Sequence, residues 1–550
     1  MSDIGTTVSQ ASNATTPITS GSRLAAPSQA MSTGDRARRD RYQGMAAGLL
    51  AAMAMLVVIV AMQHLTTVIS LIDALADALL LYIPVSIFSL MLTVFGAQAK
   101  TLLLVGLIAG LLLIGIAIGR SYARQTAGAQ RIMWIRAISI GFAIFGVIAL
   151  FMLLFVSNRT PDAITGRRLF QVMSQLGLAA MVFAVTLATT LALLRGTFAK
   201  PAFEAERSAD PDAAMSRRRF ATRAGLLVAS LAGLIVLGRE VGRVAGRKIV
   251  GISASGTLSP AITPNDDFYV ISKNFVDPDP DRGDNWSITI DGAVTNTLKL
   301  TRADLQAMPN GTFVSTLTCI SNPIGGPLIG TAEWVGTSLA GILRTAGVSS
   351  GAVKVILEGE DGYTDSIPIE RAMAPEPAVV WSMNDEPMPR LHGMPVRLIV
   401  PGLYGIKNVK WLTKITVSTE DYEGYWQQRS WTDTAIIKTS SRIDMPGDRG
   451  VASSGQIEVG GIAFAGDRGI QAVEVSTNDG ETWKEATTVE NPSPAGLSWV
   501  VWTMDWVAKP GTYKLVVRAI DGTGERQTNE PAPELPDGAS GWHRITVGVA

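Results

Sequence analysis

Residues 316–322 read Thr-Leu-Thr-Cys-Ile-Ser-Asn and contain Cys319, the single cysteine of a 550-residue chain. One thiol excludes an intramolecular disulfide, a zinc or iron–sulfur site built on four thiolates, and the two-cysteine attachment of a haem. Only His64 of the three histidines lies in an apolar segment, which disfavours a membrane haem held by two histidines. We therefore expect no haem, no iron–sulfur cluster and no zinc.

The composition indicates a membrane protein with more than one domain. The chain carries 47 basic and 47 acidic residues, so it lacks the positive charge that nucleic-acid binding requires, and we expect no DNA or RNA partner. Only 17% of the residues are charged and the mean hydropathy is +0.26, which indicates that part of the chain lies in a lipid bilayer.

The N-terminal part is predicted to comprise a tail and a membrane domain. Residues 1–44 are rich in Ser, Thr, Gly and Ala and end in a basic cluster, which predicts a disordered cytoplasmic tail. Residues 45–247 form the predicted α-helical membrane domain. Its five predicted spans are residues 45–63, 101–119, 137–158, 171–194 and 224–238.

A further apolar stretch, residues 78–99, decides the topology. The basic clusters near Arg38, Arg124 and Arg218 can all be cytoplasmic only if this stretch does not cross the bilayer. We therefore predict that residues 66–99 form a re-entrant or interfacial segment on the outer face, which gives five spans with the C-terminus outside. Six spans with one violation of the charge rule is the alternative.

The last predicted span follows the sequence Ser216-Arg-Arg-Arg-Phe220, which resembles an internal twin-arginine export signal. A stop-anchor with basic flanks is the alternative. The twin-arginine pathway carries folded domains, which suits a cofactor inserted before export. The prediction is a multi-pass protein of the cytoplasmic (inner) membrane whose following domains lie on the extracytoplasmic face.

The composition changes at about residue 248, where strands and turns replace the long apolar runs. Residues 248–435 mix strand runs with helix-like pieces, which is typical of an α+β domain. Residues 436–550 consist of short strands separated by turns, which predicts an immunoglobulin-like β-sandwich. No HExxH pair, Walker loop or GxSxG elbow occurs, which disfavours metal-dependent hydrolysis, nucleotide use and serine acyl transfer.

Several motifs in the second half together resemble the sulfite oxidase family of molybdopterin oxidoreductases. The resemblance covers roughly residues 257–549 and implies a molybdenum–molybdopterin cofactor, with a C-terminal sandwich that serves in dimerisation and so a homodimer. The motifs, besides the Cys319 stretch, are Glu333-Trp-Val-Gly-Thr-Ser-Leu339, His392-Gly-Met-Pro-Val-Arg397-Leu-Ile-Val-Pro-Gly402, Gly405-Ile-Lys-Asn-Val-Lys410-Trp411, the stretch 473–483 and Arg518-Ala-Ile-Asp521.

The resemblance also implies which side chains form the site. Cys319 would be the molybdenum ligand, because a soft thiolate suits this metal, although a lone cysteine is more often a small buried hydrophobe. Tyr363 aligns with the family's active-site tyrosine; a half-buried strand aromatic is the alternative. For Asp361 the alternative is a turn aspartate before Gly362. The other cofactor contacts that the resemblance implies are Tyr269, Asp361, His392, Arg397, Asn408, Val409 and Lys410.

The substrate arginines of the family's sulfite-oxidising members are missing. Val270 stands in place of one, Pro323 and Ile324 stand where another is expected, and the C-terminal arginine motif is absent before Trp542. A doubly charged oxyanion would lose paired hydrogen bonds here. We therefore predict oxygen-atom transfer on a small neutral or organic substrate, such as a sulfoxide or N-oxide, with sulfite disfavoured.

The electrons must be exchanged with an external carrier, a cytochrome or a quinone, because the chain lacks ligands for a haem or cluster. An alternative of a different class is a catalytically inactive sensor or scaffold whose membrane domain is the working element. Loss of activity would be expected to go with loss of the site residues. The chain instead retains Cys319, His392, Arg397 and Lys410, which argues against an inactive protein. A transporter is disfavoured, because the predicted spans contain almost no charged residues.

Overall fold

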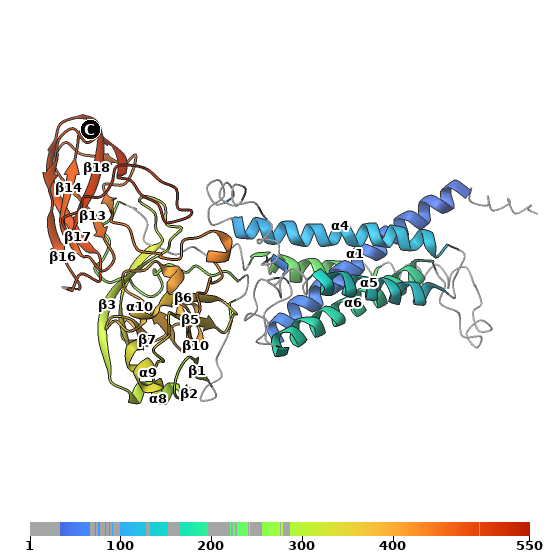
Figure 1. Cartoon of the computed structure of the whole chain (residues 1–550). Helices are drawn as coiled ribbons and strands as arrows, with labels where there is room; N and C mark the ends of the chain where they lie inside the picture. The colour runs from blue at the N-terminus through green and yellow to red at the C-terminus, as the bar shows by residue number, and fades with distance from the viewer. Residues whose placement is uncertain are drawn as a thin grey trace, which may run out of the picture.

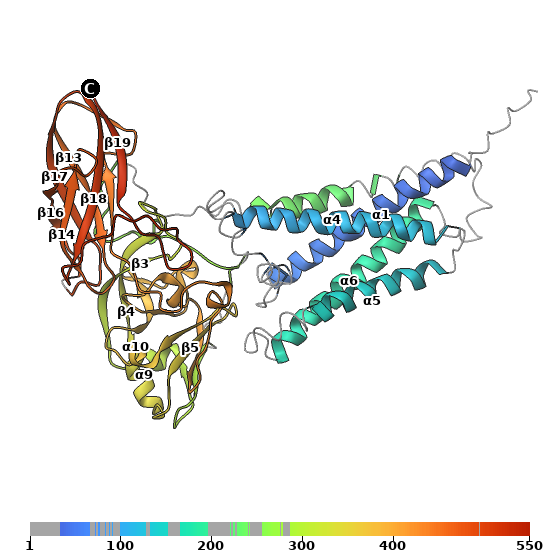
Figure 2. The ribbon, with the colours of Figure 1, turned by 45° about the horizontal axis from the view of Figure 1, so that its top comes forward.

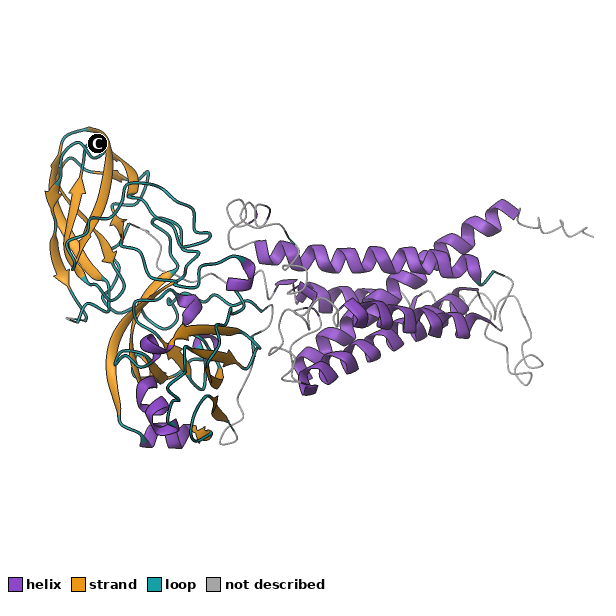
Figure 3. Cartoon of the chain, viewed as in Figure 1, coloured by secondary structure: helices purple, strands orange, loops and turns teal. Residues whose placement is uncertain are grey.

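The computed structural model separates the chain into a helical bundle and two β-rich units (Figure 1). The bundle lies at one side and the β-rich units at the other, and the turned view in Figure 2 shows the same separation. Figure 3 shows the strands in the β-rich units and the long helices in the bundle. Every strand of the described residues lies at or after Ser287. The structure describes residues 33–65, 99–127, 132–151, 166–195, 256–274, 277–278, 286–493 and 495–550, with scattered positions in 72–91 and 221–242.

Four helices of the described residues are long and apolar enough to cross a membrane. A shorter apolar helix, Val228–Arg239, overlaps the fifth predicted span, residues 224–238, and ends one residue beyond it. The twin-arginine motif and nearly all of the predicted re-entrant segment, 66–99, lie outside the described residues. The four helices are α1 Thr33–Leu65, α4 Ala99–Gln125, α5 Met133–Phe151 and α6 Gly166–Arg195.

Helix α1 begins at Thr33, so the prediction of a disordered tail is wrong for residues 33–44. Two contacts with the end of α6 hold this part of the chain. Asp40 forms an ion pair with Arg195 at 3.4 Å, and the amide of Gln43 donates to the carbonyl of Leu194 at 3.0 Å. Composition alone does not reveal such long-range partners, which is why the boundary was placed too late.

Glycines bring α1 and α4 into direct backbone contact. A Cβ added at Gly44 would meet Gly119 and Ala123, and one added at Gly48 would meet Gly115. Because the residue numbers rise along one helix as they fall along the other, the two helices are antiparallel. The start of α1 and the end of α4 therefore share one end of the bundle, and the end of α1 and the start of α4 share the other.

Two sheets build the first β-rich unit. In the first sheet, β1 pairs with β10 in parallel and the other pairs are antiparallel, a mixed arrangement in keeping with the predicted α+β class. Its strands, in spatial order, are β2 Leu298–Thr301, β1 Ser287–Gly292, β10 Leu412–Ser418, β5 Lys354–Gly359 and β6 Thr364–Pro368.

The second sheet of this unit is antiparallel. Short helices fill its connections, and Leu339, Ile342 and Leu343 of α9 are buried against the strands of the first sheet. The strands are β3 Asn310–Thr318, β4 Ile329–Ser338, β7 Ala378–Met383 and β8 Glu386–Pro387, with β9 Arg397–Ile399 paired to β7. The helices are α8 Arg302–Ala307, α9 Leu339–Ala346 and α10 Ile369–Ala372, with 3-10 turns η5 Arg390–His392, η6 Gly405–Lys407 and η7 Gln427–Arg429.

The C-terminal unit consists of two packed sheets, which share a core that includes Val459 and Trp502 from one and Leu515 and Val547 from the other. Strands β15 and β16, separated by a single residue in the sequence, belong to different sheets. The sheets are β11 Ser440–Met445, β13 Gly455–Phe464, β17 Val500–Ala508 and β16 Thr487–Glu490; and β12 Val451–Ala452, β19 His543–Val549, β18 Gly511–Asp521, β14 Ile470–Ser476 and β15 Lys484–Glu485.

Strand β3, which leads to Cys319, is fastened to the C-terminal unit. The Thr316 hydroxyl accepts from the backbone amide of Trp499 at 2.8 Å, and the Thr316 amide donates to the carbonyl of Leu497 at 3.0 Å. The guanidinium of Arg442 donates to the carbonyl of Gly326 at 2.9 Å, in the loop after Cys319. The C-terminal unit therefore helps to hold the segment that carries the single thiol.

Candidate cofactor-binding site

Every predicted site residue lines one pocket of about 730 Å³ in the first β-rich unit. Strands of both of its sheets end there, so separate stretches of the chain converge on one place. The predicted residues in its wall are Tyr269, Cys319, Asp361, Tyr363, His392, Arg397, Asn408, Val409 and Lys410. The sequence motifs, spread over some 140 residues, are thus one site in space.

Cys319 follows directly on β3 and is 7% exposed. Its amide donates to the carbonyl of Leu328 at 2.9 Å, and Asn322 closes the loop by accepting from the Leu328 amide at 2.8 Å. Within the described part of the chain, the one side chain in hydrogen-bond contact with the sulfur is Ser321, whose hydroxyl lies 3.1 Å away. Burial raises the pKa of the thiol, so a bound cation would be needed to stabilise the thiolate.

Arg397 is 5% exposed and is aimed by two backbone carbonyls. Its Nη1 donates to His392 at 2.9 Å and its Nη2 to Asn408 at 3.1 Å, whereas its buried Nε has no partner among the described residues. Gly393, at φ +124°, permits this approach, because an added Cβ would lie 2.9 Å from the Cβ of Arg397. A buried guanidinium with an unpaired donor calls for an anionic or carbonyl-bearing ligand.

His392 is buried in the pocket wall and neutral near pH 7. Burial, and then the positive charge of Arg397, lower its pKa to about 4. Its Nε2 lies 3.1 Å from the carbonyl of Asn265, so this nitrogen carries the proton and Nδ1 is an acceptor. The imidazole can therefore accept a hydrogen bond from a ligand but cannot serve as a cation.

The side chain of Asn408 forms hydrogen bonds with the protein backbone. Its Oδ1 accepts from the Val400 amide at 2.7 Å, and its Nδ2 donates to the carbonyls of Leu403 and Tyr404. Both side-chain donors of this predicted cofactor residue are therefore used within the protein, although Asn408 lies in the pocket wall. Lys410 is the cation of this turn; its Nζ donates to the carbonyls of Ile271 and Leu391, at 3.0 and 3.2 Å.

Asp361 and Tyr363 join two walls of the pocket. The Asp361 carboxylate accepts from Asn274 Nδ2 at 2.8 Å and from the Tyr363 amide at 3.0 Å, which agrees with the alternative of a turn aspartate. The Tyr363 hydroxyl lies 2.7 Å from the carbonyl of Ile406 and 2.9 Å from Asp365 Oδ2. Tyr363 is half-buried, with its ring part of the pocket surface.

Sequence reasoning missed Lys273, which also lines the pocket. Its Nζ donates to Asn274 Oδ1 at 2.8 Å and lies 5.3 Å from the centre of the Tyr425 ring. The pocket therefore has a cation beside Arg397 and Lys410, close in sequence to Val270, where the expected arginine is missing. The signal that could have found it is its position in the same segment as Tyr269. Ile324 lines a second hollow and is absent from the wall of this pocket.

Comparison with known proteins decides the family. The oxidoreductase molybdopterin binding domain matches residues 276–426, and the Mo-co oxidoreductase dimerisation domain matches residues 426–550. Sulfite oxidase of Gallus gallus is 30% identical over 319 residues, which cover 50% of this chain and 69% of that protein. The chain belongs to the sulfite oxidase family of molybdopterin oxidoreductases.

Three further proteins are similar to part of this chain. Mitochondrial sulfite oxidase of Mus musculus is 31% identical over 46% of this chain and 55% of its own length. Nitrate reductase [NADH] of Solanum lycopersicum is 26% identical over 44% of this chain and 33% of its own length. The sulfane dehydrogenase SoxCD structure from Paracoccus pantotrophus has a TM-score of 0.46 at 22% identity, covering 50% of this chain and 77% of that one.

The pocket suits the family's cofactor. It offers one thiol, an unpaired guanidinium donor, a lysine and a neutral imidazole, which match a metal, an anionic phosphate and a hydrogen-bonding pterin. Among the described residues no group of three or more His, Cys, Asp and Glu side chains could hold a metal by itself. A single protein thiol therefore fits a metal that arrives with its own sulfur ligands.

Proposed function

We propose that the chain is a membrane-anchored molybdopterin oxidoreductase that transfers an oxygen atom to or from a small neutral or organic substrate, such as a sulfoxide or N-oxide. The observation that carries the proposal is the convergence of Cys319, Arg397, Lys410 and Tyr363 on one pocket. A retired site would not be expected to keep a buried guanidinium donor unpaired, since an unsatisfied buried donor destabilises the fold.

The residues divide into those that hold the cofactor and those that face the substrate. Cys319 supplies the metal ligand, while Arg397 and Lys410 bind the anionic group of the pterin. His392 accepts a hydrogen bond from the pterin through Nδ1. When bound, the molybdopterin supplies the two-electron redox chemistry and the exchange of the oxygen atom.

Tyr363 is the residue proposed to act on the substrate. Burial and the neighbouring Asp365 raise the pKa of its hydroxyl well above the usual value, so the phenol keeps its proton at all ordinary pH values. A neutral phenol at the pocket surface can donate a hydrogen bond to a substrate oxygen and stabilise charge that develops there.

The charge of the pocket favours a substrate that is not doubly negative. With Arg397 and Lys410 assigned to the cofactor, Lys273 is the remaining cation among the described residues of the pocket wall. One ammonium group can bind a polar oxygen or a single negative charge, whereas a dianion such as sulfite calls for several paired donors. This supports the sulfoxide or N-oxide class over sulfite.

The proposed location is the inner membrane, with the cofactor domain on the extracytoplasmic face. Arg36 at the start of α1 and Arg124 at the end of α4 lie at the same end of the bundle, as the positive-inside rule requires of cytoplasmic residues. The β-rich units lie beyond the opposite end (Figure 1). The arrangement supports five spans, with export of the folded domains and electrons exchanged with an external cytochrome or quinone.

The C-terminal unit is proposed to be an immunoglobulin-like sandwich through which two copies pair. Its match to the Mo-co oxidoreductase dimerisation domain supports the homodimer, and its two packed antiparallel sheets support the sandwich.

The proposal is tested by measuring molybdenum in the full-length chain, purified in detergent from a host that makes the pterin. We expect about one molybdenum per chain, and near-complete loss in Cys319→Ala, because no second protein thiol can replace the ligand. Ser321→Ala is the control, since it removes only the 3.1 Å neighbour of the sulfur. A folded wild-type chain without molybdenum would contradict the proposal, as would an unchanged metal content in Cys319→Ala.

A further inference from the structure

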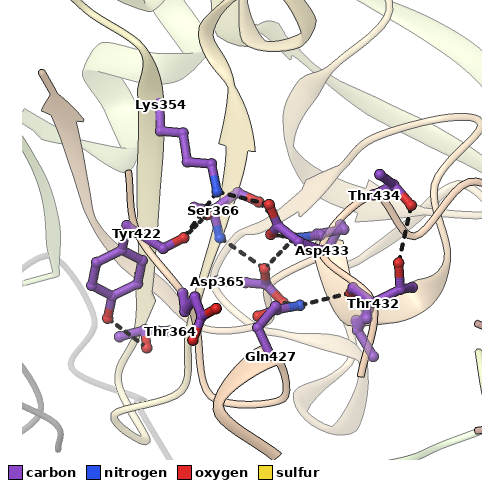
Figure 4. Close-up of polar contacts among 12 residues, drawn as sticks. Lys354, Thr364, Asp365, Ser366, Tyr422, Gln427, Thr432, Asp433 and Thr434 are labelled. Carbon is purple, nitrogen blue, oxygen red and sulfur yellow. Dashed lines mark hydrogen bonds and ion pairs between the residues drawn. The ribbon is translucent and has the colours of Figure 1, made fainter. Parts of the chain in front are cut away.

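A row of ionisable side chains begins at Tyr363 in the wall of the pocket. Figure 4 labels two carboxylates of this row, Asp365 and Asp433, with Lys354 beside Asp433. The Tyr363 hydroxyl lies 2.9 Å from Asp365 Oδ2, and Asp365 is 0% exposed. On the other side of this carboxyl, Lys407 Nζ lies 2.7 Å from Asp365 Oδ1 and is 1% exposed. The contacts thus run in the order Tyr363, Asp365, Lys407, and of these three residues Tyr363 lines the pocket.

The row continues to the protein surface. Lys407 uses its three donors on Asp365, on the carbonyl of Ser366 at 2.8 Å and on Asp433 Oδ1 at 2.9 Å. The Asp433 side chain is 43% exposed and is also held by Lys354 Nζ at 2.7 Å. Hydrogen bonds thus connect Tyr363 in the pocket wall to the half-exposed Asp433 through two fully buried side chains.

The contact between Tyr363 and Asp365 has room for a proton to move. The hydroxyl has one proton and two neighbours that accept, Asp365 and the carbonyl of Ile406. If the phenol donates to Ile406, the 2.9 Å contact is favourable only when Asp365 carries a proton. Burial raises the pKa of Asp365 and so brings the carboxyl closer to protonation. The positive charge of Lys407 opposes this rise but does not cancel it.

We propose that Tyr363, Asp365, Lys407 and Asp433 form a proton-conducting chain between solvent and the substrate side of the pocket. The inference rests on the proposed oxygen-atom transfer. In the reductive direction, the bond between the substrate atom and its oxygen breaks, two electrons come from the external cytochrome or quinol, and two protons join the oxygen to form water. In the oxidative direction the same two protons leave.

Each step passes a proton between neighbours. As Tyr363 gives its proton to the substrate side it takes one from Asp365, so the phenol is neutral before and after the step. Asp365 is replenished by the ammonium of Lys407, and Lys407 regains a proton through Asp433 from solvent. An ion pair that merely stabilised the fold would need no contact with a hydroxyl in the pocket wall. Because Lys407 contacts both the buried Asp365 and the half-exposed Asp433, protons can pass between the buried part of the row and solvent.

The test uses the full-length, molybdenum-loaded chain and Asp365→Asn, which keeps the shape of the side chain and leaves Lys407 paired with Asp433. Infrared difference spectra between electrochemically oxidised and reduced protein report a change in protonation of a buried carboxyl without turnover. We expect the wild type to show such a band and Asp365→Asn to lack it. Reduction of trimethylamine N-oxide is expected to slow by roughly 10²-fold in this variant.

Two further variants keep the test decisive. Asp433→Asn changes the exposed end of the row and leaves the buried pair of Asp365 and Lys407 intact. It is also expected to slow the reduction of trimethylamine N-oxide. Asp521→Asn is the matched control: this carboxylate is 1% exposed, pairs with Arg468 at 2.9 Å in the C-terminal unit, and its side-chain hydrogen bonds are made with residues outside the row. It should leave both the infrared band and the rate unchanged.

The outcomes separate the inference from the proposed function. A chain that folds but binds no molybdenum, or reduces no oxide, overturns the proposed function and the proton path with it. A loaded and active chain in which Asp365→Asn keeps the carboxyl band and the wild-type rate overturns the proton path alone.

Discussion

The helical bundle and the cofactor domain are held together in different ways. In the bundle, Gly48 and Gly115 allow two backbones to touch, and the contacts involve no charge. In the cofactor domain, buried charges such as Lys407 and Asp365 are each paired by several hydrogen bonds. The contact between α1 and α4 depends on close shape complementarity, whereas the pocket needs particular side chains held in particular directions, and the domain buries charge to hold them.

The largest expected effect breaks the paired charges. Lys407→Met leaves Asp365 buried without a cation and should destabilise the cofactor domain by about 3–5 kcal/mol. The thermal midpoint, followed by tryptophan fluorescence of the full-length chain, measures this, because all but one of the 12 tryptophans lie in the second half. Lys514→Met is the control: its pair with Asp479 is 64% and 43% exposed, and its loss should cost at most about 1 kcal/mol. Equal shifts in the two variants would contradict this view of the domain.

The next effect depends on pH and involves one histidine in each β-rich unit. Burial lowers the pKa of both His392 and His543 to about 4. Below about pH 6.5 the unfolded chain binds protons that the folded chain refuses, so stability falls as the pH drops from there to about 4. Each histidine contributes on the order of 3 kcal/mol to this loss. Neither histidine destabilises the fold at neutral pH, where both states are uncharged.

Comparison of the two histidines sharpens the difference between the units. His392→Gln should reduce the fall of the thermal midpoint between pH 7 and pH 4.5, and His543→Gln should reduce it separately. The double variant should be least sensitive to acid. A midpoint that falls as steeply in the double variant as in the wild type would assign the acid sensitivity to other groups.

The smallest expected effect tests the bundle. Gly48→Leu places a side chain against the backbone of Gly115 and should weaken the packing of α1 on α4 by about 1–3 kcal/mol. Gly110→Leu is the matched control on α4, because nothing lies within 4 Å of an added Cβ there. Resistance of the detergent-solubilised chain to proteolysis between α1 and α4 measures the effect. If Gly110→Leu is as disruptive as Gly48→Leu, the close contact is not what holds the two helices.

The sequence was a good guide to the site where a residue type is tied to its chemistry. Cys319 and Arg397 were named from motifs, and the structure brings both into one pocket. It was a poor guide where a side chain acts through distant partners. The amide of Asn408 is consumed by the backbone of Val400, Leu403 and Tyr404, and no motif indicates which way an amide points.

By itself, the sequence determined the division into apolar helices and β-rich units, because hydrophobic length and periodicity are local properties. It also determined the family, since several motifs in a fixed order are specific. Only the tertiary structure showed that α1 extends back to Thr33, that Lys273 joins the pocket, and that Asp365, Lys407 and Asp433 form a row to the surface. Those features depend on contacts between residues far apart in the chain, whose distances are set only when the two sheets and the helices pack.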